Sequence, residues 1–194
     1  NTTYEFIINL HSRTGKSQAI WKSLEKILKE EGVSYNVHIT EYVGHATEIA
    51  RELTQDGTYR FLVVGGGDGT VNEVLNGICD FSRVIFGYLP LGSANDFARG
   101  LHITAEPEQI LRQILASETT DAIDVGEVEC GGKTRRFAIS SGAGIDAAVC
   151  RKALTSRLKV FLNKLHLGKL TYGFLTVAEL FQAPFVSGTA TFKN

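Results

Sequence analysis

A glycine-rich stretch, Gly65–Glu73, follows a short apolar run and precedes a segment with helical spacing. Residues 61–64 read Phe-Leu-Val-Val, and such a continuous apolar run predicts a parallel strand covered on both faces. The apolar residues that recur at helical spacing are Val71, Val74, Leu75 and Ile78. We therefore expect a strand over 59–64, a glycine loop and a helix over 70–78. Glycines suit such a loop because they accept positive φ angles and let a ligand approach the backbone.

The expected loop has the properties of a phosphate site. The first N–H groups of a helix have no partner within the helix and lie at the positive end of its dipole. Asp68 lies inside the loop, where a carboxylate would repel phosphate unless a cation lay between them, which indicates Mg²⁺. A plain tight turn is the simpler interpretation. Four glycines in five positions, followed by a fixed run of polar residues, favour phosphate binding, and the dinucleotide fingerprint G-x-G-x-x-G is absent.

Strand and helix patterns alternate along the first part of the chain. The other expected strands cover 4–10, 35–40 and 84–88, and the other expected helices cover 17–31, 44–55, 94–99 and 106–116. Short connections between such elements predict an α/β fold, an open parallel sheet with helices on both faces. Ligands in such sheets bind at the carboxyl ends of the strands.

The pattern changes near Thr119, so we expect a nucleotide-binding domain over 1–122 and the beginning of a β-rich domain over 123–194. Strands are expected at 123–128 and 135–140, joined by a turn at Cys130–Lys133. Beyond them we expect helices at 146–152, 157–165 and 172–181, and a further alternating segment at 185–192. The basic amphipathic stretch 157–181 fits a membrane-surface helix and equally a core helix with solvated lysines.

Bulk composition excludes several classes of protein. The chain has 194 residues, a formal net charge of −1 and three widely spaced cysteines. This charge balance does not indicate nucleic-acid binding. The cysteines indicate free thiols in a reducing compartment. No apolar run approaches the ~20 residues of a membrane span, and no signal peptide is evident. Because the chain contains no Met, we expect it to be a piece of a longer protein.

A second motif, Pro90–Arg99, reads P-L-G-S-A-N-D-F-A-R. Together with GGGDGTVNEVLNG, it resembles the diacylglycerol kinase catalytic-domain family, which includes bacterial lipid kinases, sphingosine kinases and ceramide kinase. NAD kinases have a similar fold and share a shorter GGDGT, but this second motif favours the lipid kinases. The resemblance implies a nucleotide domain followed by a β-rich lipid-binding domain whose general base lies beyond Asn194. We therefore expect this chain by itself to be a poor or inactive enzyme.

The resemblance also implies a set of site residues. Asp68 would order the metal and water for catalysis, and a Mg²⁺ network would be shared by Asp68, Asp96 and Asp124, although each aspartate by itself also fits a cap or turn position. Leu10 and Arg13 replace a proline and a glycine of the family pattern, and Leu10 also excludes a P-loop. The residues implied to bind ATP are Asn9, Leu10, His11, Ser12, Arg13, Thr40, Gly66, Gly67, Asp68, Gly69, Thr70, Val71, Asn72, Glu73 and Ser93.

The expected function is phosphorylation of a lipid hydroxyl, that of diacylglycerol or a related lipid, with ATP and Mg²⁺. Two alternatives stay open: an NAD kinase-type reaction on a nucleotide, and a non-catalytic module that binds nucleotide or lipid. By resemblance we expect a cytoplasmic protein in peripheral contact with the inner face of the membrane, a lipid substrate as partner, and a homodimer.

Overall fold

A four-stranded parallel sheet forms the centre of the structure, a computed structural model that describes residues 2–11 and 16–141. Its strands are β1 (Thr3–Ile8), β2 (Ser34–Ile39), β3 (Arg60–Gly66) and β4 (Val84–Pro90), in the order β2-β1-β3-β4. Phe6 of β1 lies opposite Val37 on one side and Val63 on the other. All pairings are parallel, so the carboxyl ends of the four strands meet at one edge.

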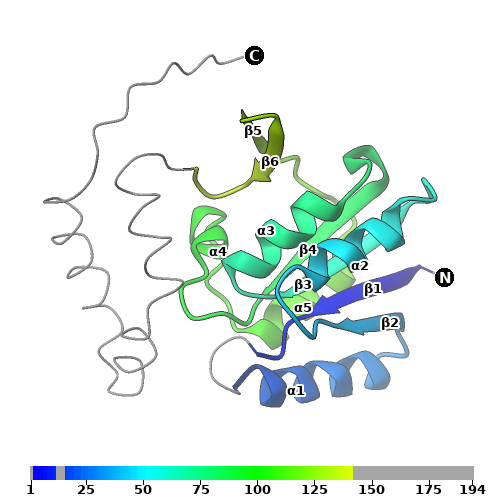
Figure 1. Cartoon of the computed structure of the whole chain (residues 1–194). Helices are drawn as coiled ribbons and strands as arrows, with labels where there is room; N and C mark the ends of the chain where they lie inside the picture. The colour runs from blue at the N-terminus through cyan, green and yellow to red at the C-terminus, as the bar shows by residue number, and fades with distance from the viewer. Residues whose placement is uncertain (1, 12–15, 142–194) are drawn as a thin grey trace, which may run out of the picture. The chain divides into compact units, whose positions relative to one another are not determined.

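Helices cover both faces of the sheet, as predicted (Figure 1). One face packs on α1 (Lys16–Glu30) and α5 (Pro107–Ala116), and the other on α2 (His45–Thr54), α3 (Asp68–Gly77) and the short α4 (Asp96–Gly100). Successive side chains of β1 alternate between the two cores: Phe6 and Ile8 join the α1 side, and Ile7 joins the α2 side. These observations confirm the predicted α/β fold class.

The glycine loop is shorter than the sequence pattern predicted. Strand β3 continues through Gly66, which pairs with Pro90 of β4, and α3 already begins at Asp68. Only Gly67 connects the two elements, in an extended conformation with φ −99°. The expectation of positive φ in this loop was wrong. Gly65, Gly66 and Gly67 instead permit close packing. A Cβ on Gly65, for example, would lie 2.6 Å from Cδ1 of Ile8.

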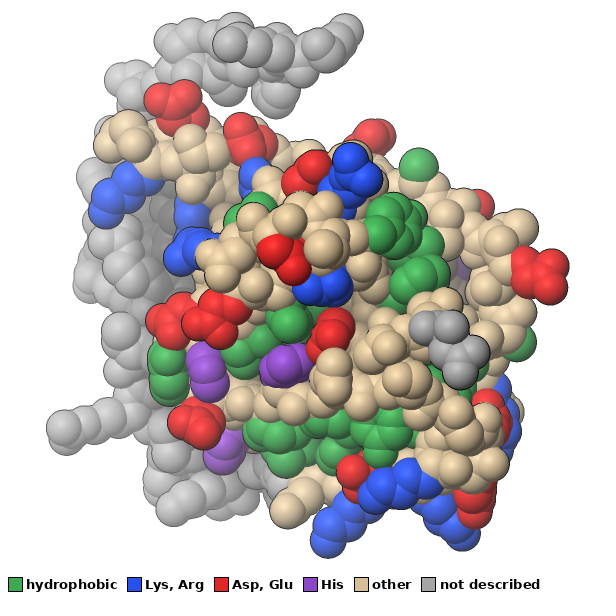
Figure 2. All heavy atoms as spheres, turned by 90° about the vertical axis from the view of Figure 1, so that its right-hand side faces the viewer, with side chains coloured by type: hydrophobic (Ala, Val, Ile, Leu, Met, Phe, Trp, Pro, Cys, Tyr) green, Lys and Arg blue, Asp and Glu red, His purple; other side chains and the backbone are tan. Residues whose placement is uncertain are grey.

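Figure 2 views the molecule from the side on which the N-terminus lies, so the carboxyl ends of the strands point away from the reader. Acidic and basic side chains are interspersed over this face. Pairs such as Lys26–Glu30 and Lys29–Glu25 on α1 are exposed and one helical turn apart. Such exposed pairs contribute little to stability.

A two-stranded hairpin follows the sheet. It consists of β5 (Gly126–Cys130) and β6 (Lys133–Phe137), joined by Gly131 and Gly132 with φ of 58° and 71°. Two positive φ values suit a tight hairpin turn. The turn lies where the sequence placed it, while β5 begins three residues later than expected and β6 begins two residues earlier.

The hairpin belongs to the same compact unit as the sheet, which spans residues 1–139, and a second unit begins at Ser140. The predicted domain boundary at 122/123 stays a prediction. The elements expected between 146 and 192 lie outside the described residues. Within the part of the chain that the structure describes, no helix is both long and apolar enough to cross a bilayer.

Candidate functional site

The carboxyl edge of the sheet is held together by backbone hydrogen bonds between strand ends. The N–H of Asn9 donates to the carbonyl of Gly65 at 2.8 Å, and the N–H of Thr40 donates to the carbonyl of Ile8 at 2.9 Å. On the other side, the N–H of Leu91 donates to the carbonyl of Gly66 at 2.9 Å. The segments that follow all four strands are therefore fixed relative to one another.

Two hollows open at this edge, and they share Asn9, Thr70 and Glu73 in their walls. The larger, about 270 Å³, lies over the glycine loop and is also lined by Gly67, Gly69, Gly92 and Ser93. The smaller, about 190 Å³, continues toward the end of β2 and is also lined by His11, Thr40, Glu41, Tyr42, Val43 and Ala46. We call the two hollows together the cleft.

The floor of the larger hollow is a contact between two glycine backbones. A Cβ added to Gly92 would lie 2.4 Å from the Cα of Gly67, so only glycine fits there. Gly69 in the first turn of α3 has nothing within 4 Å of such a Cβ, so its backbone is open on that side. The N–H groups of Thr70 and Val71 already donate to the carbonyl of Gly67, at 3.0 and 3.2 Å. Those of Asp68 and Gly69 come earlier in the helix and have no acceptor within it. The larger hollow therefore presents backbone N–H groups and the positive end of the α3 dipole, which suits an anion.

Asn9 connects the end of β1 to the first turn of α3. Its Nδ2 donates to Oγ1 of Thr70 at 3.1 Å, and its Oδ1 accepts from the N–H of His11 at 3.0 Å. Thr70 is buried, with 5% of its surface exposed. The structure thus brings Asn9, His11, Thr40, Thr70 and Glu73 to one cleft. Their predicted contact with ATP stays a prediction. Ser12 and Arg13 lie outside the described residues.

Asp68 is half-buried and connects two helices. Its Oδ1 accepts from the N–H of Phe97, at 3.0 Å, in the first turn of α4. The hydroxyl of the nearby Tyr88 donates to the carbonyl of Gly66 at 3.1 Å. Burial, and secondarily the charge of Asp68, raise the pKa of Tyr88 well above its ordinary value, so this phenol stays neutral. The carboxylate therefore has a structural role as a cap for α4 in addition to its predicted role toward a metal.

Asn95 shapes the other wall of the larger hollow. Its backbone is left-handed, with φ 53°, which asparagine tolerates better than most residues. Its Oδ1 accepts from the N–H of Gly92 at 3.0 Å and its Nδ2 donates to the carbonyl of Gly92 at 2.9 Å. This reciprocal pair holds the 92–95 turn against the glycine loop, with Ser93 exposed at its tip.

Several predicted contacts have their side chains elsewhere. Val71 is fully buried in the core on the α2 side, and Leu10 packs against the core on the α1 side. Asn72 donates from Nδ2 to the carbonyl of Arg136 at 3.1 Å, away from the cleft. Gly66 is buried, and its carbonyl already accepts from Leu91 and Gly92. Any contact of these four residues with a ligand would have to come from their backbones.

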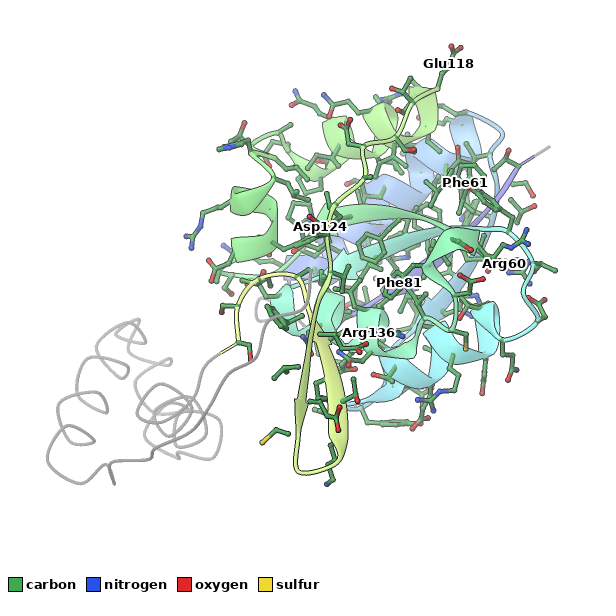
Figure 3. The ribbon with its side chains drawn as sticks, turned by 90° about the horizontal axis from the view of Figure 1, so that it is seen from above. Arg60, Phe61, Phe81, Glu118, Asp124 and Arg136 are labelled. Carbon is green, nitrogen blue, oxygen red and sulfur yellow. The ribbon has the colours of Figure 1, made fainter. Side chains whose placement is uncertain are left out.

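The predicted metal ligands come from three separate segments. Asp96 forms an ion pair with Arg99 one turn along α4, and Asp124 is exposed on the segment between α5 and β5 (Figure 3). Among residues 2–11 and 16–141, no group of three or more His, Cys, Asp or Glu side chains is arranged to hold a metal ion. Mg²⁺ is commonly held by one or two carboxylates together with phosphate oxygens. The assignment of Asp68, Asp96 and Asp124 to a metal stays a prediction.

The sequence reading missed one wall of the cleft, the segment after Thr40. Tyr42 is 53% exposed, and its ring stacks on His45 with centroids 4.5 Å apart and planes 5° apart. Its hydroxyl donates to Oε2 of Glu48 at 2.5 Å, and this hydrogen bond raises the pKa of Tyr42. The N–H of Glu41 donates to Nδ1 of His45 at 3.1 Å. An aromatic residue two positions beyond the predicted strand end at Thr40 was the sequence signal that could have revealed this wall.

Comparison with known proteins agrees with this arrangement of fold and cleft. Residues 3–128 match the family model of the diacylglycerol kinase catalytic domain. A diacylglycerol kinase of Staphylococcus carnosus is 32% identical over 162 residues, which are 79% of this chain and 49% of that protein. YtlR of Bacillus subtilis, which is assigned as a lipid kinase, is 32% identical over 174 residues, 86% of this chain and 56% of that protein.

A crystal structure of a diacylglycerol kinase from Bacillus anthracis superposes with a TM-score of 0.57 and 23% identity, covering 84% of this chain and 53% of that one. This likeness supports the fold alone. The family model covers more than half of the chain, and the chain therefore belongs to the diacylglycerol kinase catalytic-domain family. It spans about half the length of the curated relatives that it matches.

Proposed function

We propose that this chain carries the nucleotide-binding part of a lipid kinase that transfers the terminal phosphoryl group of ATP, with Mg²⁺, to the hydroxyl of diacylglycerol or a related lipid. The observation that carries the proposal is the cleft at the carboxyl edge of the sheet, with a helix N-terminus and close-packed glycines at its floor. Such a site binds and orients phosphates through backbone amides, which is the main task of a protein in phosphoryl transfer.

The larger hollow would hold the phosphates against Gly67, Gly69 and Ser93. The smaller hollow would hold the nucleoside, because it combines polar groups of Asn9 and Thr40 with the exposed ring of Tyr42. Stacking of a base on an aromatic ring is sequence-tolerant and contributes about 1–3 kcal/mol. The shared wall of Asn9, Thr70 and Glu73 would then face the junction between nucleoside and phosphates.

Mg²⁺ would be placed by Asp68, which lies in the first turn of α3 beside the expected phosphates. The donor set fits such an ion, since Mg²⁺ prefers carboxylate and phosphate oxygens. The ion would neutralise charge that develops on the transferring group. We also propose that the protein is cytoplasmic and dimeric. It would reach its lipid substrate by peripheral contact with the inner face of the membrane.

The test is calorimetric titration of the chain with ATP, with and without Mg²⁺, on wild type and on Asp68→Asn. The amide keeps an oxygen that can accept from the N–H of Phe97 but removes the charge. We expect the wild type to bind ATP more tightly with Mg²⁺ than without it. In the variant, this increase in ATP affinity should be about tenfold smaller, equivalent to about 1.4 kcal/mol. Asp80→Asn is the matched control, because Asp80 caps η1 (Phe81–Arg83) through the N–H of Ser82 in the same way.

The acceptor is tested in a protein extended to the length of its relatives, with labelled ATP, vesicles that contain diacylglycerol, and NAD in the same reaction. Label on the lipid supports the proposal. Label on NAD alone would instead assign the chain to nucleotide phosphorylation. Binding of Mg²⁺-ATP without transfer, in a protein extended to the length of its relatives, would point to a non-catalytic module.

A further inference from the structure

Arg136 of β6 is bound to the carboxyl-terminal end of α3 by its side chain (Figure 3). Its Nη1 donates to the carbonyl of Ile78 at 2.7 Å and to that of Leu75 at 3.3 Å. Its guanidinium carbon lies 4.9 Å from the centre of the Phe81 ring, within range of a cation–π contact. Glu127 of β5 pairs with its Nε at 3.4 Å.

The backbone of Arg136 is bound to the same helix. Its N–H donates to Oδ1 of Asn76 at 2.9 Å, and its carbonyl accepts from Nδ2 of Asn76 at 3.0 Å and of Asn72 at 3.1 Å. Asn72 and Asn76 are four residues apart and therefore lie on one face of α3. Nδ2 of Asn76 also donates to the carbonyl of Asn72 at 2.8 Å. We call Arg136, Asn72 and Asn76 the α3 clamp.

The α3 clamp lies at one end of α3, and the larger hollow lies at the other. We call Gly67 and the first turn of α3, which line that hollow, the phosphate cradle. The last carbonyls of a helix have no partner within it, and a cation near them is favourable because of the helix dipole. Arg136 supplies that cation and donates to those carbonyls. At the other end, the N–H groups of the first turn would face an anion. Helix α3 has ten residues, so the two ends are about 15 Å apart.

We propose that Arg136 is a positioning residue for the phosphate cradle: by holding the carboxyl-terminal end of α3, the clamp sets the orientation in which the first turn of α3 meets an anion. This inference rests on the proposed function, because it takes the larger hollow as the phosphate site. Binding of the anion and docking of the β5–β6 hairpin then stabilise each other. Such coupling is reciprocal by thermodynamic necessity. The hairpin immediately precedes the second unit of the chain, so the clamp would also connect occupancy of the cleft to the segment that enters that unit.

A purely structural role for Arg136 makes a different prediction. If Arg136 only covered the end of α3, its loss would lower the free energy of unfolding but leave the anion affinity of the folded protein unchanged. If it positions the cradle, the affinity changes as well. The comparison must therefore measure binding and stability on the same samples, well below the unfolding midpoint.

The experiment compares wild type, Arg136→Met and Arg136→Lys in the full 194-residue chain. Calorimetry measures binding of Mg²⁺-ATP and of inorganic tripolyphosphate, and chemical denaturation measures stability. We expect Arg136→Met to lower the affinity for both ligands by about fivefold or more, since couplings between sites are typically 5–150-fold. Arg136→Lys should recover part of the loss, because it restores the charge. Arg112→Met is the matched control. Arg112 belongs to α5, on the opposite face of the sheet, and forms an ion pair with Glu31.

A second measurement keeps the inference testable if Arg136→Met does not fold. Amide hydrogen exchange of wild-type β6 should slow when tripolyphosphate is bound, most of all at the N–H of Arg136, which is bonded to Asn76. Unchanged affinity in Arg136→Met, or unchanged exchange in β6 on saturation, would overturn the coupling and leave the proposed function standing. Absence of binding of either ligand to wild type would overturn the phosphate site itself and the coupling with it.

Discussion

The contact between Gly67 and Gly92 makes the most direct prediction about the cleft. We consider Gly92→Ala, which adds a single methyl group. That Cβ would lie 2.4 Å from the Cα of Gly67 and 2.7 Å from Oδ1 of Asn95. Ordinary contact requires about 3.4 Å or more, so the two loops would have to separate by about 1 Å.

Such a separation has consequences for both stability and binding. The N–H groups of Leu91 and Gly92 donate to the carbonyl of Gly66 at 2.9 and 3.1 Å, and a shift of about 1 Å would break both bonds. At about 1 kcal/mol for each bond, Gly92→Ala should lower the free energy of unfolding by about 2 kcal/mol. The same shift would displace the backbone of Gly67 from an anion in the larger hollow. Loss of one hydrogen bond to a charged group costs about 1.5 kcal/mol or more, so we expect ATP affinity to fall by about tenfold or more.

Urea denaturation and ATP calorimetry measure the two effects. Gly100→Ala is the matched control, because a Cβ there meets nothing within 4 Å and Gly100 ends α4 away from the cleft lining. We expect this control to bind ATP as the wild type does and to change stability by less than about 0.5 kcal/mol, as for surface substitutions. If Gly92→Ala matched the wild type in both measurements, the inference that the glycine contact shapes the phosphate site would be refuted.

Three further predictions follow from other contacts of the site and the fold. Tyr42→Ala should weaken ATP binding by about fivefold or more through loss of base stacking but leave tripolyphosphate binding unchanged, while Tyr42→Phe, which keeps the ring, should keep the affinity for ATP. Equal effects of Tyr42→Ala on both ligands would contradict the stacking role. Tyr88→Phe removes the hydroxyl that contacts the carbonyl of Gly66 and should lower the free energy of unfolding by about 1 kcal/mol in urea denaturation, whereas no change would show that the contact is not stabilising. Hydrogen bonds from Ser82 hold the pKa of Asp80 below its ordinary value, so its contribution to stability is present above the unfolded pKa of about 4 and is lost as pH falls through the lower folded pKa. Thermal unfolding of Asp80→Asn should therefore depend less on pH between about 2 and 5 than that of wild type. Identical pH profiles of the two proteins would contradict this.

The sequence by itself determined the layers of this protein and the place of its cleft. Alternation at 35–40 and the apolar run of β3 depend on near neighbours in the chain, and so do the helical spacings of α1, α2 and α5. Because parallel strands bring their carboxyl ends to one edge, the ordering of these patterns also places Asn9, Thr40 and the glycine loop at the same edge. The family motif at Pro90–Arg99 added the fourth segment of that edge.

Only the tertiary structure decided which partner each polar residue has. Asn72 follows the glycine motif closely, yet the rotation of α3 directs it to Arg136, which is 64 positions away. The structure also gives the glycines separate roles: Gly65 packs against Ile8, whereas Gly67 meets Gly92. Tyr42 became part of the cleft only through the fold. The physical reason is that local patterns specify periodicity and turns, while contacts between distant segments depend on strand register and helix rotation, which the packed core sets as a whole.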